Sequence, residues 1–267
     1  MNRKPAVAGQ FYPDNGRTLS SLVQSMIADT AEKRDVVAIV SPHAGYVYSG
    51  GVAGEVFSKI NVPNDVIILG PNHHGLGHPV AVYASGSWET PIGIVAINSG
   101  LAEIVLQQSR FMASDVTAHL HEHSLEVQVP FLQHLNPQCK IVPICVSGLD
   151  YASCREVGLG LAQAIKEYGR PVLIVASSDM THFESQSSAQ KKDQLAIDRI
   201  LAMDPEGLLK IVRSRGITMC GVIPTTIALV AAINLGATKA ELVKYATSGE
   251  VAGDYARVVG YAGLTIY

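Results

Sequence analysis

The sequence predicts an α/β fold in which one domain, residues 1–267, is built on a central, largely parallel sheet wrapped by helices. Short apolar runs rich in β-branched residues alternate with segments of helical periodicity along the chain. Hydrophobic residues make up 48% of the sequence and charged residues 16%, which provides enough apolar material for a thick core. Because no internal repeat, low-complexity stretch or linker interrupts the alternation, one domain is favoured over two.

Four apolar runs predict buried parallel strands at residues 36–40, 66–69, 139–146 and 171–176. Further strands are expected at residues 80–83, 241–246 and 256–266. Helical periodicity indicates helices at residues 15–29, 51–60, 123–135, 153–168, 189–203, 205–214 and 225–235. Trp88 falls in a turn-like segment, and we expect it to form a partly buried lid over the core. This order of strands and helices is typical of a wrapped parallel sheet.

Charge and composition exclude several classes of protein. The net charge is -3 and no basic block occurs, so we expect no nucleic-acid partner. No apolar run is long enough for a membrane span, and no apolar segment follows Arg3 and Lys4 as it would in a signal peptide. The four cysteines form no C-x-x-C pair, which is typical of reduced thiols. We therefore expect a cytoplasmic protein that does not associate with membranes.

Histidines follow three of the predicted parallel strands at the point where each strand ends. His43 comes after the first strand, His73 and His74 after the second, and Asp179 and His182 after the fourth. Ligands of open α/β sheets bind outside the carboxyl ends of the strands. A single histidine in such a place is more often a hydrogen-bonded loop residue, but three in equivalent places favour a metal or catalytic site. Neutral imidazole binds zinc, iron and copper alike.

A second cluster of histidines precedes the helix expected at residues 123–135. It resembles the zinc-protease pattern H-E-x-x-H, but Leu125 stands where the second histidine of that pattern would be. We expect His119 and His121 to lie in a solvated loop. Glu122 and His123 lie at the start of the helix, where His123 either faces the pocket or remains in the loop.

Cys220 precedes the apolar residues 222–235, which are expected to be helical. A helix N-terminus lowers the pKa of a thiol, and thiolate is a strong ligand for soft or borderline metals. The alternative is a buried structural cysteine, the commonest fate of a free one. The patterns of dinucleotide-binding loops, phosphate-binding P-loops and G-x-S-x-G nucleophile turns do not occur.

Six short motifs occur in the order seen in the Memo-like proteins. They are residues 8–13 (AGQFYP), 42–46 (PHAGY), 70–74 (GPNHH), 122–126 (EHSLE), 177–179 (SSD) with His182, and 220–221 (CG). The tail at residues 245–267 is also similar to that of the family. The chain thus resembles this family, whose prokaryotic members are often called AmmeMemoRadiSam system protein B.

The resemblance implies a fold shared with class III extradiol ring-cleaving dioxygenases, which bind Fe(II) through two histidines and one carboxylate. His43 and His73 match the two histidine ligands, and Cys220 falls at the position of the carboxylate, as is typical of the Memo branch. The implied centre is thus a His2Cys site, with iron(II) foremost and copper or zinc as alternatives. Because thiolate changes the charge and redox behaviour of the metal, ring cleavage does not follow from the resemblance.

Other pocket positions are also implied by the resemblance. His182 matches the catalytic histidine, while Asp179 and His123 match further residues that could act in catalysis. Tyr48 matches a residue of the pocket. His74 and Glu122, which belong to two of these motifs, are expected to line the pocket as well.

Three functions are compatible with the sequence. The first is a metal-dependent redox or dioxygenase-like protein of unknown substrate, in which His182 moves a proton. The second is a metal-binding protein without turnover that recognises a small-molecule or peptide ligand. The third is a zinc hydrolase, with Asp179 or His182 as base. The family also implies a functional link to a radical-SAM protein, and the high apolar content allows a homo-oligomer.

Overall fold

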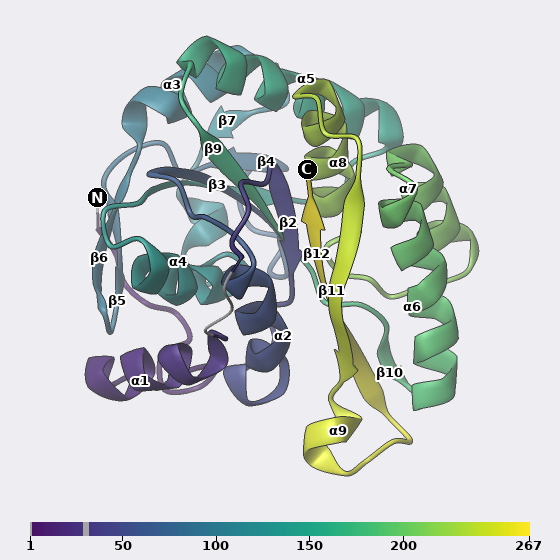
Figure 1. Ribbon diagram of the computed structural model, residues 1–267. Coiled ribbons are helices and arrows are strands. Elements are labelled where there is room, and N and C mark those ends of the chain that lie inside the picture. The colour runs from purple at the N-terminus through teal and green to yellow at the C-terminus, as the bar shows by residue number, and fades with distance from the viewer. Residues whose placement is uncertain (1, 29–31) are drawn as a thin grey trace.

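Five parallel strands form the middle of a 12-stranded sheet (Figure 1) in the computed structural model, which describes residues 2–28 and 32–267. Their order across the sheet is β6 (Gly93–Ile97), β8 (Lys140–Val146), β3 (Asp65–Pro71), β9 (Val172–Ser177) and β2 (Ala38–Ser41). In the central strand β3, Ile67 and Leu69 pack on one face and Val66 and Ile68 on the other. Burial on both faces explains why this strand is a continuous apolar run rather than an alternating one.

Further strands extend both edges of the parallel centre. Beside β2 lies the antiparallel β12 (Val258–Ile266), which pairs with β11 (Ala240–Thr247) and with β10 (His182–Glu184). Beside β6 lie the antiparallel β5 (Ser87–Thr90) and then β1 (Asn2–Arg3). The end of β8 pairs with β4 (Val80–Val82), which pairs with β7 (Ala113–Ser114). The predicted α/β class with a largely parallel central sheet is confirmed.

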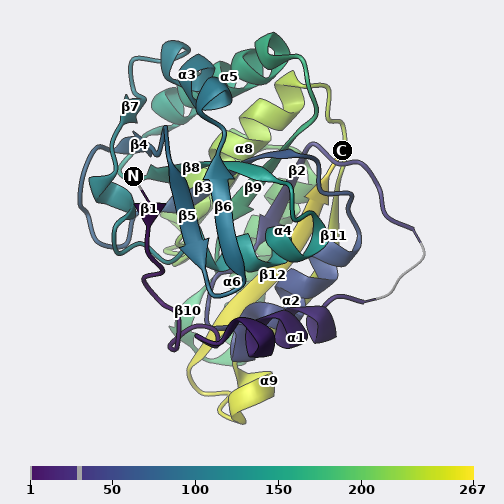
Figure 2. The same ribbon diagram turned by 90° about the vertical axis from the view of Figure 1, so that its left-hand side faces the viewer.

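Helices cover both faces of the sheet and bury two separate apolar clusters (Figures 1 and 2). One face carries α1 (Gly16–Met26), α2 (Tyr46–Ser58) and α4 (Val129–Leu135). The other carries α3 (Ser99–Gln107), α5 (Tyr151–Tyr168), α6 (Gln186–Leu201), α7 (Pro205–Ser214) and α8 (Val222–Asn234). The short α9 (Gly249–Ala252) lies between β11 and β12.

Side chains fix the start of several helices by accepting a hydrogen bond from a backbone N–H group of the first turn. The capping residues are Asn15 before α1, Asp150 before α5, Ser185 before α6 and Asp204 before α7. Two of these helices also have a boundary that sequence rules predict. Helix α5 is capped at its C-terminus by Gly169, whose φ of +69° is left-handed, and α7 begins at Pro205. Local sequence therefore determines much of the helical framework.

Some elements differ from their predicted bounds. Helix α2 begins at Tyr46, five residues before the expected start at residue 51, and α4 begins at Val129 after a 3₁₀ turn rather than at residue 123. The expected end of the first helix, residue 29, lies outside the described residues. The expectation for Trp88 was wrong, because it lies in β5 with 1% of its surface exposed. Strands β1, β5, β6, β7 and β10 and helices α3 and α9 were not predicted.

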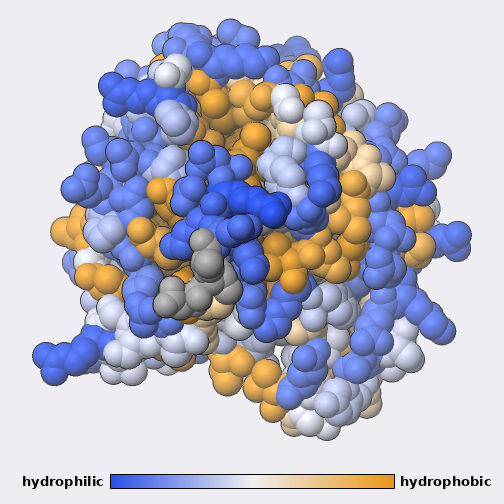
Figure 3. All heavy atoms as spheres, viewed as in Figure 1, coloured by the Kyte–Doolittle hydropathy of each residue, from blue (hydrophilic) through white to orange (hydrophobic). Residues whose placement is uncertain are grey.

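The face of the molecule seen in Figure 1 is covered mainly by hydrophilic side chains, with hydrophobic atoms showing between them (Figure 3). Scattered apolar atoms of this kind are usual on folded proteins. Among the described residues, no helix has both the length and the apolar character that a membrane crossing requires.

The contact between α5 and α8 predicts opposite effects of one substitution at two helical glycines. A Cβ at Gly158 of α5 would lie 2.7 Å from Val230 Cβ and 2.8 Å from the Ile227 carbonyl oxygen of α8. We expect Gly158→Ala to lower the free energy of unfolding by about 1–3 kcal/mol because the two helices must separate. The measurement is urea unfolding followed by circular dichroism.

Gly51 of α2 is the matched control, because a Cβ there meets no atom within 4 Å among the described residues. Gly51→Ala should raise the free energy of unfolding by roughly 0.5–1 kcal/mol, since alanine favours the helix. A stabilising effect of Gly158→Ala would contradict the packing described for α5 and α8.

Candidate metal centre

The carboxyl ends of neighbouring parallel strands deliver polar side chains to one place. His43 lies two residues after β2, His73 two residues after β3, and Asp179 two residues after β9. His123 reaches the same place from the turn that precedes α4. The position agrees with the rule that ligands of open α/β sheets bind at this edge.

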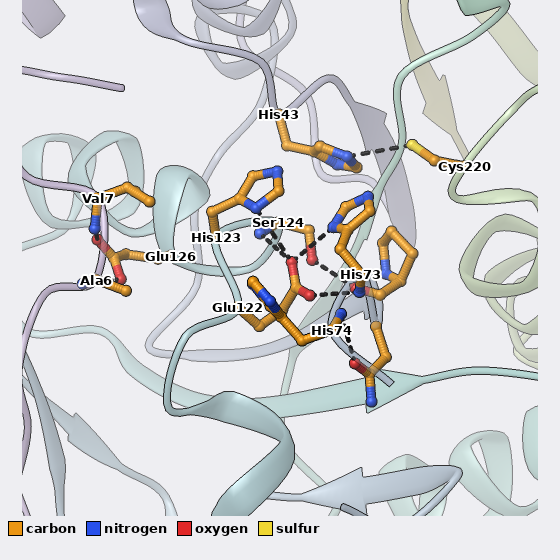
Figure 4. A network of polar contacts seen from close by, with 12 residues as sticks. Ala6, Val7, His43, His73, His74, Glu122, His123, Ser124, Glu126 and Cys220 are labelled. Atoms are coloured by element: carbon orange, nitrogen blue, oxygen red, sulfur yellow. Dashed lines mark hydrogen bonds and ion pairs between the residues drawn. The ribbon is translucent and has the colours of Figure 1, made fainter. Parts of the chain in front are cut away.

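Three imidazoles form the centre of this site (Figure 4). One nitrogen from each of His43, His73 and His123 lies within 4.8 Å of the other two. The rings of His73 and His123 are stacked with centroids 4.6 Å apart, and the His43 ring meets them edge-on at 5.3 and 5.5 Å. Such a convergence of imidazole nitrogens is a donor set for zinc, iron or copper.

Hydrogen bonds fix which nitrogen of His43 is free. The single hydroxyl proton of Ser177 is donated to the carbonyl oxygen of Ser124, at 2.5 Å, and Gln128 Nε2 donates to Ser177 Oγ at 2.9 Å. Ser177 Oγ therefore accepts from His43 Nδ1, 2.9 Å away. Nδ1 of His43 carries the proton, and Nε2 presents its lone pair to the centre.

The carboxylate of Glu122 orients His73 in a similar way. Its Oε1 lies 2.8 Å from His73 Nδ1 and accepts the N–H of Ser124 at 2.9 Å, while Oε2 accepts the N–H of His73 at 2.6 Å. Burial would raise the pKa of Glu122, but the hydrogen bonds and charge of His73 outweigh it and lower the pKa to about 2. Glu122 is thus a carboxylate that keeps the proton of His73 on Nδ1, the arrangement typical of metal-bound histidines.

Burial keeps His43 and His123 neutral, as metal ligands must be. It lowers the pKa of His123 to about 4 and that of His43 well below the usual value, and His123 lowers the pKa of His43 further. The ring of Phe11 packs on His123 with centroids 4.6 Å apart and closes one side of the cluster.

Cys220 lies beside this cluster, immediately before Gly221, the residue that caps α8. Its Sγ is 3.2 Å from His43 Nε2, and the backbone N–H of Asp179 donates to it at 3.3 Å. A Cβ at Gly221 would lie 2.3 Å from the Ser177 carbonyl oxygen, so only glycine lets this segment approach the end of β9 so closely. Sequence and geometry thus bring a sulfur atom against the ligand nitrogen of His43.

The expected lowering of the Cys220 pKa by the helix N-terminus is not found. Burial and the charge of Asp179 raise the pKa of the thiol above its ordinary value. Hydrogen bonds from backbone groups, including the N–H of Asp179, lower the pKa of the thiol but do not compensate for the loss of water around the sulfur. A bound cation would act in the opposite direction, because metal-coordinated thiols are deprotonated.

Asp179 and His182 lie beside the centre in different environments. Asp179 is buried, accepts the N–H of His43 at 2.7 Å, and has its pKa raised by burial to about 6. His182 opens β10, where a loop was expected. Its Nδ1 lies 3.0 Å from the carbonyl oxygen of Thr218, so this nitrogen carries the proton and Nε2 is the acceptor.

The remaining candidates lie farther out. Tyr48, in the first turn of α2, and His74 are exposed, and the His74 ring faces that of His121 at 6.3 Å. The expectation of a solvated loop was wrong for His119, which is fully buried with its Nε2 3.0 Å from the Ala81 carbonyl oxygen. Supporting residues such as Ser177 and Gln128 were not predicted. The adjacency of Ser177 to the end of a strand was the available signal.

Comparison with known proteins gives a consistent result. The sequence profile of the family described as Memo-like protein matches residues 3–265. The MEMO1 family protein MK0963 of Methanopyrus kandleri is 43% identical, with 99% of this chain and 98% of the relative covered. A MEMO1 family protein of Aquifex aeolicus is also 43% identical, with 98% of each chain covered.

One solved structure shares the fold. The uncharacterized protein JW3007 from Escherichia coli K12 superposes with a TM-score of 0.57 at 13% sequence identity, over 85% of this chain and 98% of that one.

The hydrogen bonds of Ser177 predict the tautomer of His43. In Ser177→Ala the acceptor of the His43 Nδ1 proton is lost, so we expect a mixture of the two neutral tautomers in place of one. Nitrogen-15 chemical shifts of the imidazole, measured on metal-free protein, distinguish the two forms. The His73 ring, held by Glu122, is the internal control and should keep its shifts. An unchanged His43 spectrum would contradict this assignment.

Buried histidines predict a loss of stability in mild acid. Burial lowers the pKa of His119 to about 4, whereas an unfolded chain has a histidine pKa near 6.5. The unfolded state binds the proton first, so the free energy of unfolding falls as pH decreases from about 6.5 to about 4. His119→Gln should make this decrease shallower, by on the order of 3 kcal/mol across the interval.

The exposed His121 provides the control for this measurement, since His121→Gln should leave the slope unchanged. Urea unfolding at half-unit pH intervals gives both slopes. Equal slopes for the wild type and His119→Gln would show that His119 does not contribute to the loss of stability in acid.

Proposed function

The chain belongs to the Memo-like protein family, and we propose that it is a redox-active metalloprotein that binds one ion at the carboxyl ends of β2 and β3. The observation that carries the proposal is the convergence of ligand atoms of His43, His73 and His123 within 4.8 Å of one another, beside the sulfur of Cys220. Imidazoles with assigned tautomers and a carboxylate behind one of them are features of metal sites rather than of ordinary loops.

We propose Nε2 of His43, Nε2 of His73 and Sγ of Cys220 as the ligands. The 3.2 Å between His43 Nε2 and Cys220 Sγ supports these two as ligands of one ion, because typical metal–nitrogen and metal–sulfur bonds are about 2.1 and 2.3 Å long. Among the described residues, the ligand atoms within 4.8 Å of one another are those of His43, His73 and His123, so the sulfur would have to approach His73 when a metal binds. Two histidines and one anionic ligand leave positions open, as in non-haem iron(II) sites. Iron(II) is therefore the proposed metal, and copper and zinc suit the same donors.

When bound, such an ion would provide a place where an organic ligand and an oxidant can meet. His182 is the proposed proton carrier, because its Nε2 is the acceptor nitrogen of an imidazole fixed by Thr218. Asp179 holds the backbone of His43 and thereby the position of that ring. His123, stacked on His73, either supplies a further nitrogen to the ion or borders the bound ligand.

The three-imidazole cluster also favours a second candidate, a zinc-dependent hydrolase. Three histidines that leave a fourth position open are a known catalytic zinc set, in which bound water is the nucleophile. In this case Cys220 would not be a ligand, and His123 would take its place. The two candidates therefore differ both in the third ligand and in the metal.

The proposed roles predict different losses in two histidine variants. His43→Ala should lose the bound metal, because it removes a ligand. His182→Ala should retain the metal and lose turnover by about 10²–10⁴, the usual contribution of general acid–base catalysis. The measurements are metal content after anaerobic purification and oxygen uptake with catechols and small phenols. If His182→Ala lost metal as completely as His43→Ala, His182 would be a ligand and the proposed division of roles would be wrong.

Two further variants separate the candidates. Cys220→Ala should lose metal and His123→Ala should retain it if the site is His2Cys, and the reverse is expected for a three-histidine zinc site. Iron or copper with oxygen uptake supports the redox protein, whereas zinc with ester hydrolysis and no oxygen uptake supports the hydrolase. A wild-type protein that binds none of these metals would overturn both.

A further inference from the structure

We propose that Arg3 is a positioning residue of the metal centre, which it reaches through residues 119–126, here called the site segment. The inference rests on the proposed metal binding, and it concerns how the ligands are held rather than which metal they bind. Arg3 lies in β1, whose two residues pair with β5 at the edge of the sheet. Although it is close to the N-terminus, its side chain is buried, with 1% of its surface exposed.

The guanidinium of Arg3 binds the site segment at three points. Nε donates to the carbonyl oxygen of His119 at 2.6 Å, and Nη2 donates to the carbonyl oxygen of Glu122 at 2.7 Å. Nη1 donates to Glu126 Oε2, also at 2.6 Å, in an ion pair whose two side chains are each 1% exposed. One planar group thus fixes the two sides of the turn before His123 and the start of the 3₁₀ turn after it.

Every imidazole of the centre depends on the site segment. The Glu122 side chain orients His73, and His123 belongs to the segment itself. The carbonyl oxygen of Ser124 receives the hydroxyl proton of Ser177, which leaves Ser177 to accept from His43. A shift of the segment would therefore disturb all three nitrogens.

Glu126 ties the same segment to residues 6–12, which follow β1. Its carboxylate accepts the N–H groups of Ala6 and Val7 at 2.7 and 3.1 Å (Figure 4). It also accepts the hydroxyl of Tyr12 at 2.5 Å. The three donors to the Glu126 carboxylate and the carbonyl oxygens that accept from Arg3 replace the water that this buried ion pair has lost. The N-terminal residues therefore hold the site segment rather than merely lying beside it.

Lysine cannot replace arginine in this place. The Arg3 guanidinium stacks 4.3 Å from the centre of the Trp88 ring, which is 1% exposed. An ammonium group has no planar fork with which to reach two carbonyl oxygens and a carboxylate at once. Arg3→Lys keeps the positive charge beside Glu126 and removes the three-point attachment, so it tests positioning separately from charge.

The test is a titration of the metal-free full chain with Co²⁺, whose visible spectrum reports the ligand geometry. Arg3→Lys should bind Co²⁺ about 10–100-fold more weakly than the wild type, the usual effect of losing an outer-shell partner. Its spectrum should also change. The inference would be overturned if a folded Arg3→Lys protein bound Co²⁺ with an affinity within twofold of the wild type and gave the same spectrum.

The matched control is Asp65→Asn, which alters a buried charged group at the opposite end of the sheet. Asp65 is 5% exposed and accepts hydrogen bonds from Asn98 at 2.5 Å and Tyr168 at 2.9 Å. A general loss of stability would weaken Co²⁺ binding equally in both variants and would overturn the inference, whereas positioning by Arg3 predicts weakening in Arg3→Lys alone.

The wild type and a second variant distinguish failure of the proposed function from failure of this inference. Failure of the wild type to bind Co²⁺ would overturn the proposed function and this inference together, whereas normal wild-type binding with unchanged Arg3→Lys overturns only the inference. If Arg3→Lys does not fold, Glu126→Gln decides, because it removes the ion pair and keeps the shape of the side chain. Co²⁺ affinity weakened several-fold supports the inference, and unchanged affinity overturns it.

Discussion

A carboxylate without exposed surface keeps its charge only where hydrogen-bond donors replace the water that it has lost. Glu122 is held in this way by two backbone N–H groups and the ring of His73. If Glu122 were neutral, the proton of His73 would no longer be fixed on Nδ1. The nitrogen that faces the centre could then carry the proton and would have no lone pair to offer a metal. The geometry of the site thus follows from keeping one buried acid ionised.

The pKa values of two carboxyl groups near the centre, those of Glu122 and Asp179, are shifted in opposite directions. Glu122 receives donors on both oxygens and has a pKa of about 2, whereas the burial of Asp179 dominates and raises its pKa to about 6. One group is a permanent anion at neutral pH and the other lies near its titration point. Glu122 therefore provides a buried negative charge behind the His73 ring.

The sequence was sufficient for features that depend on local pattern and poor for those that depend on distant partners. Residues 205–214 were predicted as a helix with the observed bounds, because Asp204 and Pro205 mark its start. His119 and His121 are two residues apart and indistinguishable by pattern, yet one is buried against the Ala81 carbonyl oxygen of a distant strand. Likewise Trp88 lies in a strand because residues 2–3 and 93–97 pair with it. The positions of His43 and His73 at strand ends were predicted from the sequence. Their tautomers were not, because they depend on hydrogen bonds to Ser177 and Glu122, which are distant in sequence.

The site is assembled from parts of the chain that are far apart in sequence. Arg3 and Glu126 are separated by 123 residues, and His43 and Cys220 by 177. During synthesis, β1 is made long before Glu126, the partner of Arg3. Cys220 is made only after most of the chain. Contacts of such long range slow folding, because loop closure has to precede any gain from the contact. If the chain binds a metal as proposed, its full set of ligands exists only after Cys220 has been synthesised and has folded against His43.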